Sequence, residues 1–322
     1  MSLTDFGDVI KAGALTEVVM IRPEEQLNSS SDTKKARNAR SGSEILKDRL
    51  DPFHSLLTEY GDVVSKTPPM GLPSDRGVRH EIDFVPRTKY CVTRQWPLPK
   101  EQCDVIDAFF RAKHEVGLQV SALHANILCQ KSKWQVGYRS CFNKLNAATI
   151  PAQTPIPCKD VLQNNIVGCT YSALDLVDGY YQLLMRASDI PLTAVSTPSG
   201  MLWEWLAMPQ GLSNAPATFN RLVMQSFRPH RAYAQTYFDD IFIHSRAAHG
   251  RSDVENHVDH LRTVLECMDT NKLYTNADKC IFGAEETPFV GCFIGKRGLR
   301  ADPAKVKAIV DWPVPVNLKD LT

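Results

Sequence analysis

The chain has 322 residues, of which 43% are apolar and 23% charged, enough for one large domain or two smaller ones with a sizeable core. Its formal net charge of +1 excludes a strongly basic protein, so a nucleic-acid groove has to come from local clusters of charge. The nine cysteines form no CxxC pair, which argues against a zinc ribbon or redox motif and favours free thiols in a reducing compartment.

The sequence carries no signal for secretion and no membrane span. The first residues, Met1-Ser2-Leu3-Thr4-Asp5, lack a basic stretch followed by an apolar core. No apolar run approaches the ~20 residues that cross a bilayer. We therefore expect an intracellular, cytoplasmic protein without a membrane partner.

Two N-terminal segments precede a globular unit. Residues 1–43 comprise a possible short helix over 1–22 and a polar, Ser-rich, basic stretch that is typical of a flexible linker. Residues 44–79 begin a helix at Asp51-Pro52, with the aspartate as N-cap, and continue as an extended connector. The linker cations are either solvated or in contact with nucleic acid or a transport factor; they are Lys34, Lys35, Arg37 and Arg40.

Residues 80–322 read as one globular unit in which helical and strand patterns alternate. Turn and cap residues divide the unit into elements. In chain order we predict a helix over 100–116, a strand with a turn and helix over 170–185, a hairpin over 192–207, a helix from Asn214, a hairpin over 233–245, a helix around 258–268, a second hairpin with Gly295 at its turn, and a last helix capped by Asp302-Pro303.

Three aspartates stand out because each lies inside an apolar, strand-like run. Asp175 is part of SALDL, and Asp239 and Asp240 are part of YFDDIFI. A carboxylate in such a run costs several kcal/mol of desolvation unless a cation neutralises it. Bound divalent cations would remove both this cost and the mutual repulsion of the carboxylates. Oxygen-only ligation favours Mg²⁺ over zinc or copper.

The alternative interpretation of Asp239-Asp240 is a solvated turn, since an Asp-Asp dipeptide is expected about once in a chain of this length. Neighbouring strand residues point to opposite faces, so both aspartates reach one site only near a hairpin tip or a local distortion. A different metal set, made of His257, His260, Cys267 and Cys280, has loose spacing and is disfavoured.

The order strand, helix, paired strands, helix, hairpin is that of a split βαβ sheet, the ferredoxin-like α+β plan. Such a sheet can place Asp175 beside the tip that carries Asp239 and Asp240. Three carboxylates there can hold two Mg²⁺ ions ~3.5–4 Å apart, which would activate an attacking hydroxyl and clamp a leaving pyrophosphate.

Several long motifs resemble one family. The run LDLVDGYYQLLMRASDIPLTAVSTPSGMLWEWLAMPQGLSNAPATFNRL, the box YFDDIFIHS, and LYTNADKCIFGAEETPFVGCFIG followed by ADPAKVKAIVDWPVP are similar to the reverse transcriptases of gypsy-type LTR retrotransposons, and more distantly to retroviral ones. The resemblance covers roughly residues 76–322. It implies a right-hand polymerase fold with fingers and a ferredoxin-like palm, in a chain that stops about where a thumb begins.

The resemblance also implies an activity and its ligands. The expected activity is RNA-directed DNA polymerisation within a Pol polyprotein, in the cytoplasm or in virus-like particles. The expected ligands are two Mg²⁺ ions (with Mn²⁺ as the alternative), a primed RNA or DNA template, and deoxynucleoside triphosphates; the oligomeric state stays open.

The family implies a role for each matching position. Tyr180 would crowd the sugar 2′ position, although a core tyrosine is the alternative, and Gln210 would contact the nucleotide, although alone it would be an ordinary loop residue. The full set is Asp175, Asp239 and Asp240 as catalytic metal ligands, the amides of Asp178 and Gly179 on the triphosphate, Tyr180 and Gln210 on the nucleotide, and Phe289, Val290 and Gly291 as the primer grip.

The fingers region departs from the family pattern. A Trp-Arg dipeptide is expected in a cationic hairpin, but Trp134 is followed by Gln135, which cannot supply a charged fork for phosphate. Lys131 and Lys133 remain as nucleotide-binding candidates, and Arg139 is a further substitute. The departure supports an alternative function, a degenerate and inactive copy that retains only nucleic-acid binding.

Overall fold

The computed structural model describes residues 39–65, 71–88, 100–121, 128–130, 138–140, 142–153, 158–166, 168–196 and 200–311. The chain divides into a unit of residues 36–300 and a unit of residues 1–35 with 301–322. The described part of the smaller unit centres on helix α9 (Pro303–Val310), whose N-cap Asp302 accepts a hydrogen bond from the Ala304 amide at 2.9 Å, as predicted. None of the helices in the described ranges has the length and apolarity to cross a membrane.

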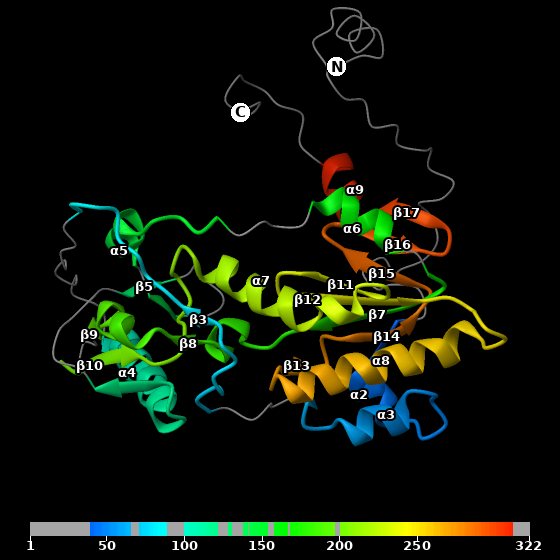
Figure 1. Ribbon diagram of the computed structural model, residues 1–322, viewed down its shortest axis with the longest axis horizontal. Coiled ribbons are helices and arrows are strands. Elements are labelled where there is room, and N and C mark those ends of the chain that lie inside the picture. Colours follow the sequence, from blue (N-terminus) through cyan, green and yellow to red (C-terminus); the bar gives the residue numbers. More distant parts are fainter. Residues whose placement is uncertain are drawn as a thin grey trace, which may run out of the picture. The chain divides into compact units, whose positions relative to one another are not determined.

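A five-stranded sheet organises the larger unit (Figure 1). β7 lies at its centre and pairs antiparallel with both neighbours, β12 and β14. The strand order is β1 (Arg40–Ser41), β14 (Ile281–Ala284), β7 (Thr170–Asp175), β12 (Asp240–Ser245) and β11 (Ala234–Tyr237).

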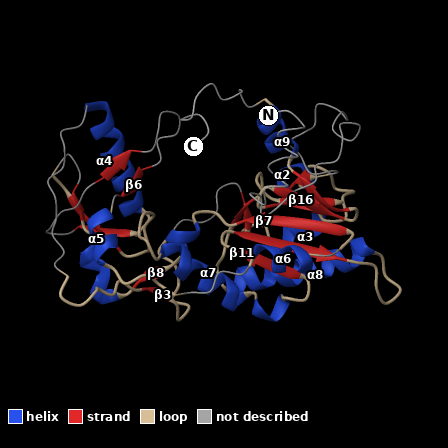
Figure 2. Cartoon of the chain, turned by 90° about the horizontal axis from the view of Figure 1, so that it is seen from above, coloured by secondary structure: helices blue, strands red, loops and turns tan. Residues whose placement is uncertain are grey.

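The two faces of this sheet bury different residues, because alternate strand residues point to opposite sides. Leu174 and Ile241 belong to the main core, which includes residues of α3 (His54–Glu59), α7 (Ala215–Ser226) and α8 (Asp253–Thr270). Tyr171 and Phe242 belong to a second cluster with Leu162 of α6 (Lys159–Asn165), Phe289 of β15 (Glu286–Phe289) and Ile294 of β16 (Cys292–Gly295). Helix α8 runs along the sheet in both views (Figures 1 and 2).

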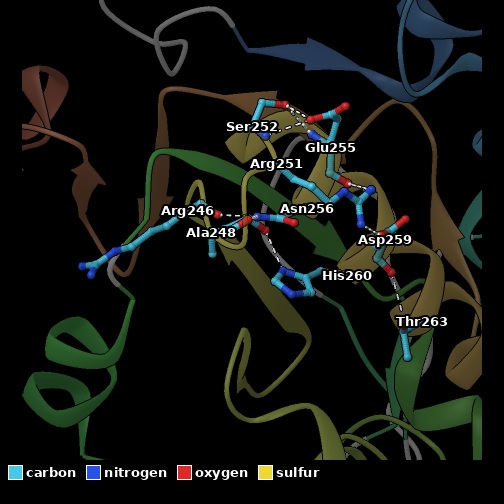
Figure 3. A network of polar contacts seen from close by, with 10 residues as sticks. Arg246, Ala248, Arg251, Ser252, Glu255, Asn256, Asp259, His260 and Thr263 are labelled. Atoms are coloured by element: carbon cyan, nitrogen blue, oxygen red, sulfur yellow. Dashed lines mark hydrogen bonds and ion pairs between the residues drawn. The ribbon is translucent and has the colours of Figure 1, made fainter.

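Polar contacts fix the start of α8 to the end of β12 (Figure 3). Ser252 and Glu255 form a capping box, in which the Ser252 hydroxyl accepts from the Glu255 amide at 3.2 Å and the Glu255 carboxylate accepts from the Ser252 amide at 2.8 Å. Asn256 donates to the Arg246 carbonyl at 2.8 Å. The long helix therefore begins at a defined residue, which sets the position of its apolar face on the sheet.

The remaining elements are short apart from α4. Phe110 of α4 packs on Trp205 of β10, and Trp205 stacks on Tyr181. The other elements are α2 (Gly42–Ile45), β2 (Val64–Ser65), β3 (Arg79–His80), α4 (Lys100–Glu115), β4 (Gln119–Ser121), β5 (Leu128–Gln130), β6 (Tyr138–Ser140), α5 (Asn143–Ala148), η2 (Gly179–Gln182), β8 (Leu184–Met185), η3 (Ala187–Thr193), β9 (Val195–Ser196), β10 (Leu202–Trp205), η4 (Arg228–His230), β13 (Thr275–Asn276) and β17 (Gly298–Ala301).

Several predicted elements are confirmed. The helix over 100–116 is α4, the helix that follows Asn214 is α7, and the helix around 258–268 is part of α8. The hairpins over 192–207 and 233–245 are the pairs β9–β10 and β11–β12. The helix predicted over 1–22 lies outside the described residues.

The flexible linker predicted to reach residue 43 ends earlier. Arg40 and Ser41 form β1, an edge strand on β14, and Ser41 caps α2. Arg40 forms an ion pair with Asp51, which is buried. Helix α3 begins later than predicted, with Phe53 instead of Asp51 at its cap position, although the Asp51 carboxylate still accepts from the Phe53 amide at 2.9 Å. The buried Asp51 carboxylate thus contacts both the Phe53 amide and the partly exposed Arg40 guanidinium.

The second predicted hairpin is present as the neighbouring strands β16 and β17. Its turn lies one residue later than predicted, at Lys296 and Arg297, because Gly295 is the last residue of β16 and pairs with Glu286. A further hairpin, which was not predicted, joins β15 to β16 through Val290 and Gly291, which both adopt positive φ.

Candidate active site

Asp175 ends β7 and Asp240 begins β12, and the two residues are direct partners across the sheet. The Leu176 amide donates to the Asp239 carbonyl at 2.9 Å. Leu176 and Asp239 are thus a hydrogen-bonded pair, which makes Asp175 and Asp240 a non-hydrogen-bonded pair. In such a pair the side chains share one face and the Cα atoms are closest, about 4.5 Å apart. The expected proximity of Asp175 to the hairpin is therefore present.

Asp239 lies at the hairpin tip beside Asp240. Tyr237 pairs with Asp240, so Phe238 and Asp239 alone make the turn. Phe238 has a φ of 51°, in the left-handed region that a non-glycine residue rarely adopts. The strained turn is what brings two adjacent aspartates to one end of the sheet, which an undistorted strand cannot do.

The site concentrates negative charge at partly buried positions. Burial raises the pKa of Asp240 to about 6, and the charges of Asp175 and Asp239 contribute to the rise. The pKa of Asp239 is also raised, first by burial and then by Asp175, with Lys279 acting in the opposite direction. Lys279 Nζ lies 3.7 Å from Asp175 Oδ1. One exposed ammonium does not balance three carboxylates, so the site favours a further cation.

The donor set fits a hard divalent ion, because it consists of carboxylate oxygens on one end of a sheet. Within the described residues no three His, Cys, Asp or Glu side chains are already spaced as a metal site. The three carboxylates are close enough to affect one another's charge, but they do not form a closed cage. In the disfavoured set of His257, His260, Cys267 and Cys280, the His257 ring hydrogen-bonds Ser172 and Ser245.

A tight turn follows β7 at the predicted triphosphate-binding residues. Asp178 has a φ of 47° and begins the 3₁₀ helix η2. Gly179 allows this turn to contact Phe219, because a Cβ at Gly179 would lie 2.5 Å from the Phe219 ring. Among the described residues, the amides of Asp178 and Gly179 donate to no carbonyl. They thus remain available to an anionic ligand.

Tyr180 also packs against Phe219. Its ring meets that of Phe219 edge to face, with centroids 5.8 Å apart. The tyrosine is partly buried at the margin of the main core, so its body is fixed while part of the side chain is accessible. Gln210 is exposed in the loop before α7, next to Gly211, whose carbonyl accepts from Asn146 at 2.9 Å.

Of the predicted primer-grip residues, one is buried in the core and the other two form a turn at the surface. Phe289 is fully buried, with its ring 4.9 Å from that of Phe242. Val290 is 38% exposed and forms the turn with Gly291. A primer could contact only this turn directly. Lys131, Lys133 and Gln135 lie outside the described residues.

Lys113, near the end of α4, was missed by sequence reasoning. It is buried, and its ammonium lies 3.7 Å from Asp178 Oδ2 and 4.3 Å from the centre of the Tyr181 ring. Only its place in the last turn of an amphipathic helix was visible in the sequence. A cavity of about 280 Å³ adjoins the same turn; its lining includes Val177, Asp178, Tyr181, Gln182, Lys272 and Tyr274.

Solved reverse transcriptases share the fold of this chain. The foamy viral protease-reverse transcriptase in complex with dsDNA superimposes with a TM-score of 0.68 at 17% identity, over 95% of this chain and 62% of that one. The same enzyme in complex with an RNA/DNA hybrid gives a TM-score of 0.67 at 18% identity, over 86% and 38%.

The sequence comparison is more specific. Residues 120–294 match the family model described as reverse transcriptase (RNA-dependent DNA polymerase), and the chain belongs to this family. It is 37% identical over 182 residues to the Retrovirus-related Pol polyprotein from transposon opus of Drosophila melanogaster, covering 56% of this chain and 17% of that protein. It is 26% identical over 303 residues to the Transposon Tf2-3 polyprotein of Schizosaccharomyces pombe, covering 92% and 22%. The chain thus spans under a quarter of these relatives.

Proposed function

We propose that the chain is the RNA-directed DNA polymerase segment of a gypsy-type LTR retrotransposon Pol polyprotein. It extends a primer with deoxynucleotides on an RNA or DNA template. One observation carries the proposal: Asp175 lies directly opposite Asp240, with Asp239 at the adjoining hairpin tip. The foamy viral relatives of the same fold were solved with an RNA/DNA hybrid and with dsDNA, which supports primed duplex as the ligand.

Asp175, Asp239 and Asp240 are the residues that would hold two Mg²⁺ ions, with Mn²⁺ as the alternative. When bound, the ions supply activation of the primer 3′-hydroxyl and neutralisation of the leaving pyrophosphate. Ionised carboxylates have no hydrogen-bond donors, so these side chains cannot donate to the phosphate oxygens of the substrate. Their contribution is to bind the metal ions at the end of β7 and β12.

The remaining candidate residues bind and orient the nucleotide. The amides of Asp178 and Gly179 would donate to triphosphate oxygens, as turn amides can. Tyr180, braced by Phe219, would stand beside the sugar and exclude a 2′-hydroxyl. Gln210 would contact the nucleotide from its exposed loop, and Lys131 and Lys133 would approach the phosphates. Val290 and Gly291 would contact the primer while Phe289 anchors their turn in the core.

A second candidate function is a degenerate copy that binds nucleic acid without polymerising. Gln135, in place of the expected arginine, is the observation that favours it. A primer-extension assay on RNA and DNA templates with Mg²⁺, run beside a duplex-binding assay, separates the two. Mg²⁺-dependent extension that EDTA abolishes supports polymerisation. Tight binding without extension, with either Mg²⁺ or Mn²⁺, would establish the degenerate copy instead.

A further inference from the structure

The backbone of Asp175 has a gap in its strand pairing on the side away from β12. Because Asp175 and Asp240 are a non-hydrogen-bonded pair, the amide and carbonyl of Asp175 point toward β13 and β14. β14 pairs with β7 at Ala173, and β13 makes an isolated bridge to Leu176. Between these two contacts no strand faces Asp175. The chain that joins β13 to β14 turns there.

Two side chains fill the gap, that of Thr275 in β13 and that of Cys280 at the end of this turn. The Thr275 hydroxyl lies 2.5 Å from the Asp175 carbonyl oxygen, and the Cys280 sulfur lies 3.4 Å from the Asp175 amide nitrogen. Thr275 Oγ1 and Cys280 Sγ are 2.7 Å apart. Both residues are buried, at 0% and 1% exposure, so water does not compete for these contacts.

The direction of each hydrogen bond follows from the donor inventory. A carbonyl only accepts, so the single hydroxyl proton of Thr275 is donated to Asp175. The contact between Thr275 and Cys280 must then use the thiol proton, and the sulfur accepts the Asp175 amide. Asp175, Cys280 and Thr275 thus form a closed ring in which each member donates once and accepts once.

The ring requires Cys280 as a thiol. Cys280 is only 1% exposed, and a cysteine buried in this way is kept in its thiol form. The same turn carries Lys279, whose ammonium lies 3.7 Å from the Asp175 carboxylate. The short segment of residues 275–280 therefore contacts the amide, the carbonyl and the carboxylate of Asp175.

We propose that Thr275 and Cys280 are positioning residues, which hold the end of β7 so that the Asp175 carboxylate faces the metal-binding region. This inference rests on the proposed function for the role of Asp175. The hydrogen-bond ring replaces a strand that would otherwise cover this edge. It holds the backbone of Asp175 on the side away from β12 and uses neither of its carboxylate oxygens.

Thr275→Val tests the ring because valine keeps the shape of threonine and removes the hydroxyl. We expect kcat of primer extension to fall about tenfold to a hundredfold, as for a misplaced catalytic group. The Mg²⁺ concentration for half-maximal activity should rise, whereas duplex affinity should not change. Thr275→Ser should recover most of the loss. The matched control is Thr287→Val, since Thr287 is equally buried and its hydroxyl has no partner in the described chain.

Cys280→Ala removes the acceptor of the Asp175 amide and gives a readout that does not depend on activity. We expect hydrogen exchange of the Asp175 amide to become about tenfold faster or more, while amides in the middle of β7 keep their protection. Cys280→Ser is the second variant, for use if the alanine variant folds poorly. Its hydroxyl reaches less far than the thiol, so amide exchange at Asp175 should be intermediate between the wild type and Cys280→Ala. The double variant with Thr275→Val should lose no more kcat than the worse single variant, because both open one ring.

Two sets of results separate the failures. A wild-type chain that extends no primer refutes the proposed function. Amide exchange still tests whether the hydrogen-bond ring holds the backbone of Asp175. Unchanged Asp175 exchange in both Cys280 variants overturns the inference. So does wild-type kcat and Mg²⁺ dependence in Thr275→Val, or an equal loss in Thr275→Val and Thr287→Val.

Discussion

Asp175 and Asp240 face each other as a non-hydrogen-bonded pair at the end of two antiparallel strands. Their side chains share the face that buries Tyr171 and Phe242 further along the same strands. The apolar part of the face is covered, whereas its end carries carboxylates. This arrangement places charge where a metal and a substrate could approach, and it leads to the first two predictions.

Asp239→Asn should lower primer extension by about two orders of magnitude or more, because a metal ligand loses its charge in a site that stabilises the transition state electrostatically. Duplex affinity should stay nearly constant, since phosphate contacts come from other residues. Single-turnover extension and duplex binding measure the two effects. Asp259→Asn, an exposed aspartate of α8 paired with Arg251, is the control. Wild-type extension rates in Asp239→Asn would refute the catalytic assignment.

Asp240→Asn should stabilise the metal-free fold at neutral pH. The pKa of Asp240 is raised to about 6 from 3.8, so the folded chain binds more protons than the unfolded chain between these values. Stability from this group is therefore highest below pH 4 and falls as the pH rises through 6. The gain in the variant at pH 7.5 should be about 1–2 kcal/mol, less than the full shift implies because water screens part of the carboxylate.

Urea unfolding in EDTA at pH 7.5 and pH 4 checks this sign. The difference between Asp240→Asn and the wild type should shrink toward the lower pH. Mg²⁺ should stabilise the wild type more than the variant, because a ligand stabilises a folded protein in proportion to its affinity and the variant has lost a charged ligand. A variant that is less stable than the wild type at pH 7.5 would show that Asp240 is compensated by a partner.

Gly179→Ala should disturb the turn that carries the candidate triphosphate amides. The added Cβ would lie 2.5 Å from the Phe219 ring, which is fully buried and cannot move freely. We expect a loss of about 1–3 kcal/mol in stability, as for overpacking, together with a higher nucleotide KM. Adding Phe219→Leu should restore part of both. Nucleotide binding unaffected by Gly179→Ala would exclude this turn from the site.

Tyr180→Ala should admit ribonucleotides, because it removes the ring that is proposed to crowd the sugar. Discrimination between deoxy- and ribonucleotides should fall about tenfold or more, whereas Tyr180→Phe should retain it. Single-nucleotide incorporation with each sugar measures the ratio. Equal discrimination in the alanine and wild-type proteins would support the interpretation of Tyr180 as a core residue packed on Phe219.

Gln135→Arg should lower the nucleotide KM if the fingers hairpin follows the family register. A charge-assisted contact that the glutamine cannot make is worth roughly 1.5–3 kcal/mol, or about tenfold to a hundredfold in affinity. Steady-state extension kinetics give the KM. Gln225→Arg, at an exposed position of α7, controls for added charge. An unchanged KM would indicate that Arg139 or another cation already binds the phosphates.

The aspartate motifs and the order of elements were readable from the sequence alone. Asp175, Asp239 and Asp240 each interrupt a run of strand-forming apolar residues, and local patterns of this kind specify strands and turns without long-range information. The same holds for α8, whose capping box and apolar spacing lie within one segment. The resemblance to reverse transcriptases likewise depended on motifs that are contiguous in the chain.

Contacts between distant segments were decided only by the tertiary structure. The ring around Asp175 joins residues that are far apart in the chain, and no local pattern pairs Thr275 or Cys280 with it. Lys113 reaches Asp178 only because α4 packs beside that turn. The ion pair between Asp51 and Arg40 likewise depends on the pairing of β1 with β14, which no local pattern indicates. Such partners are chosen by packing and burial, which bring together groups that the sequence separates.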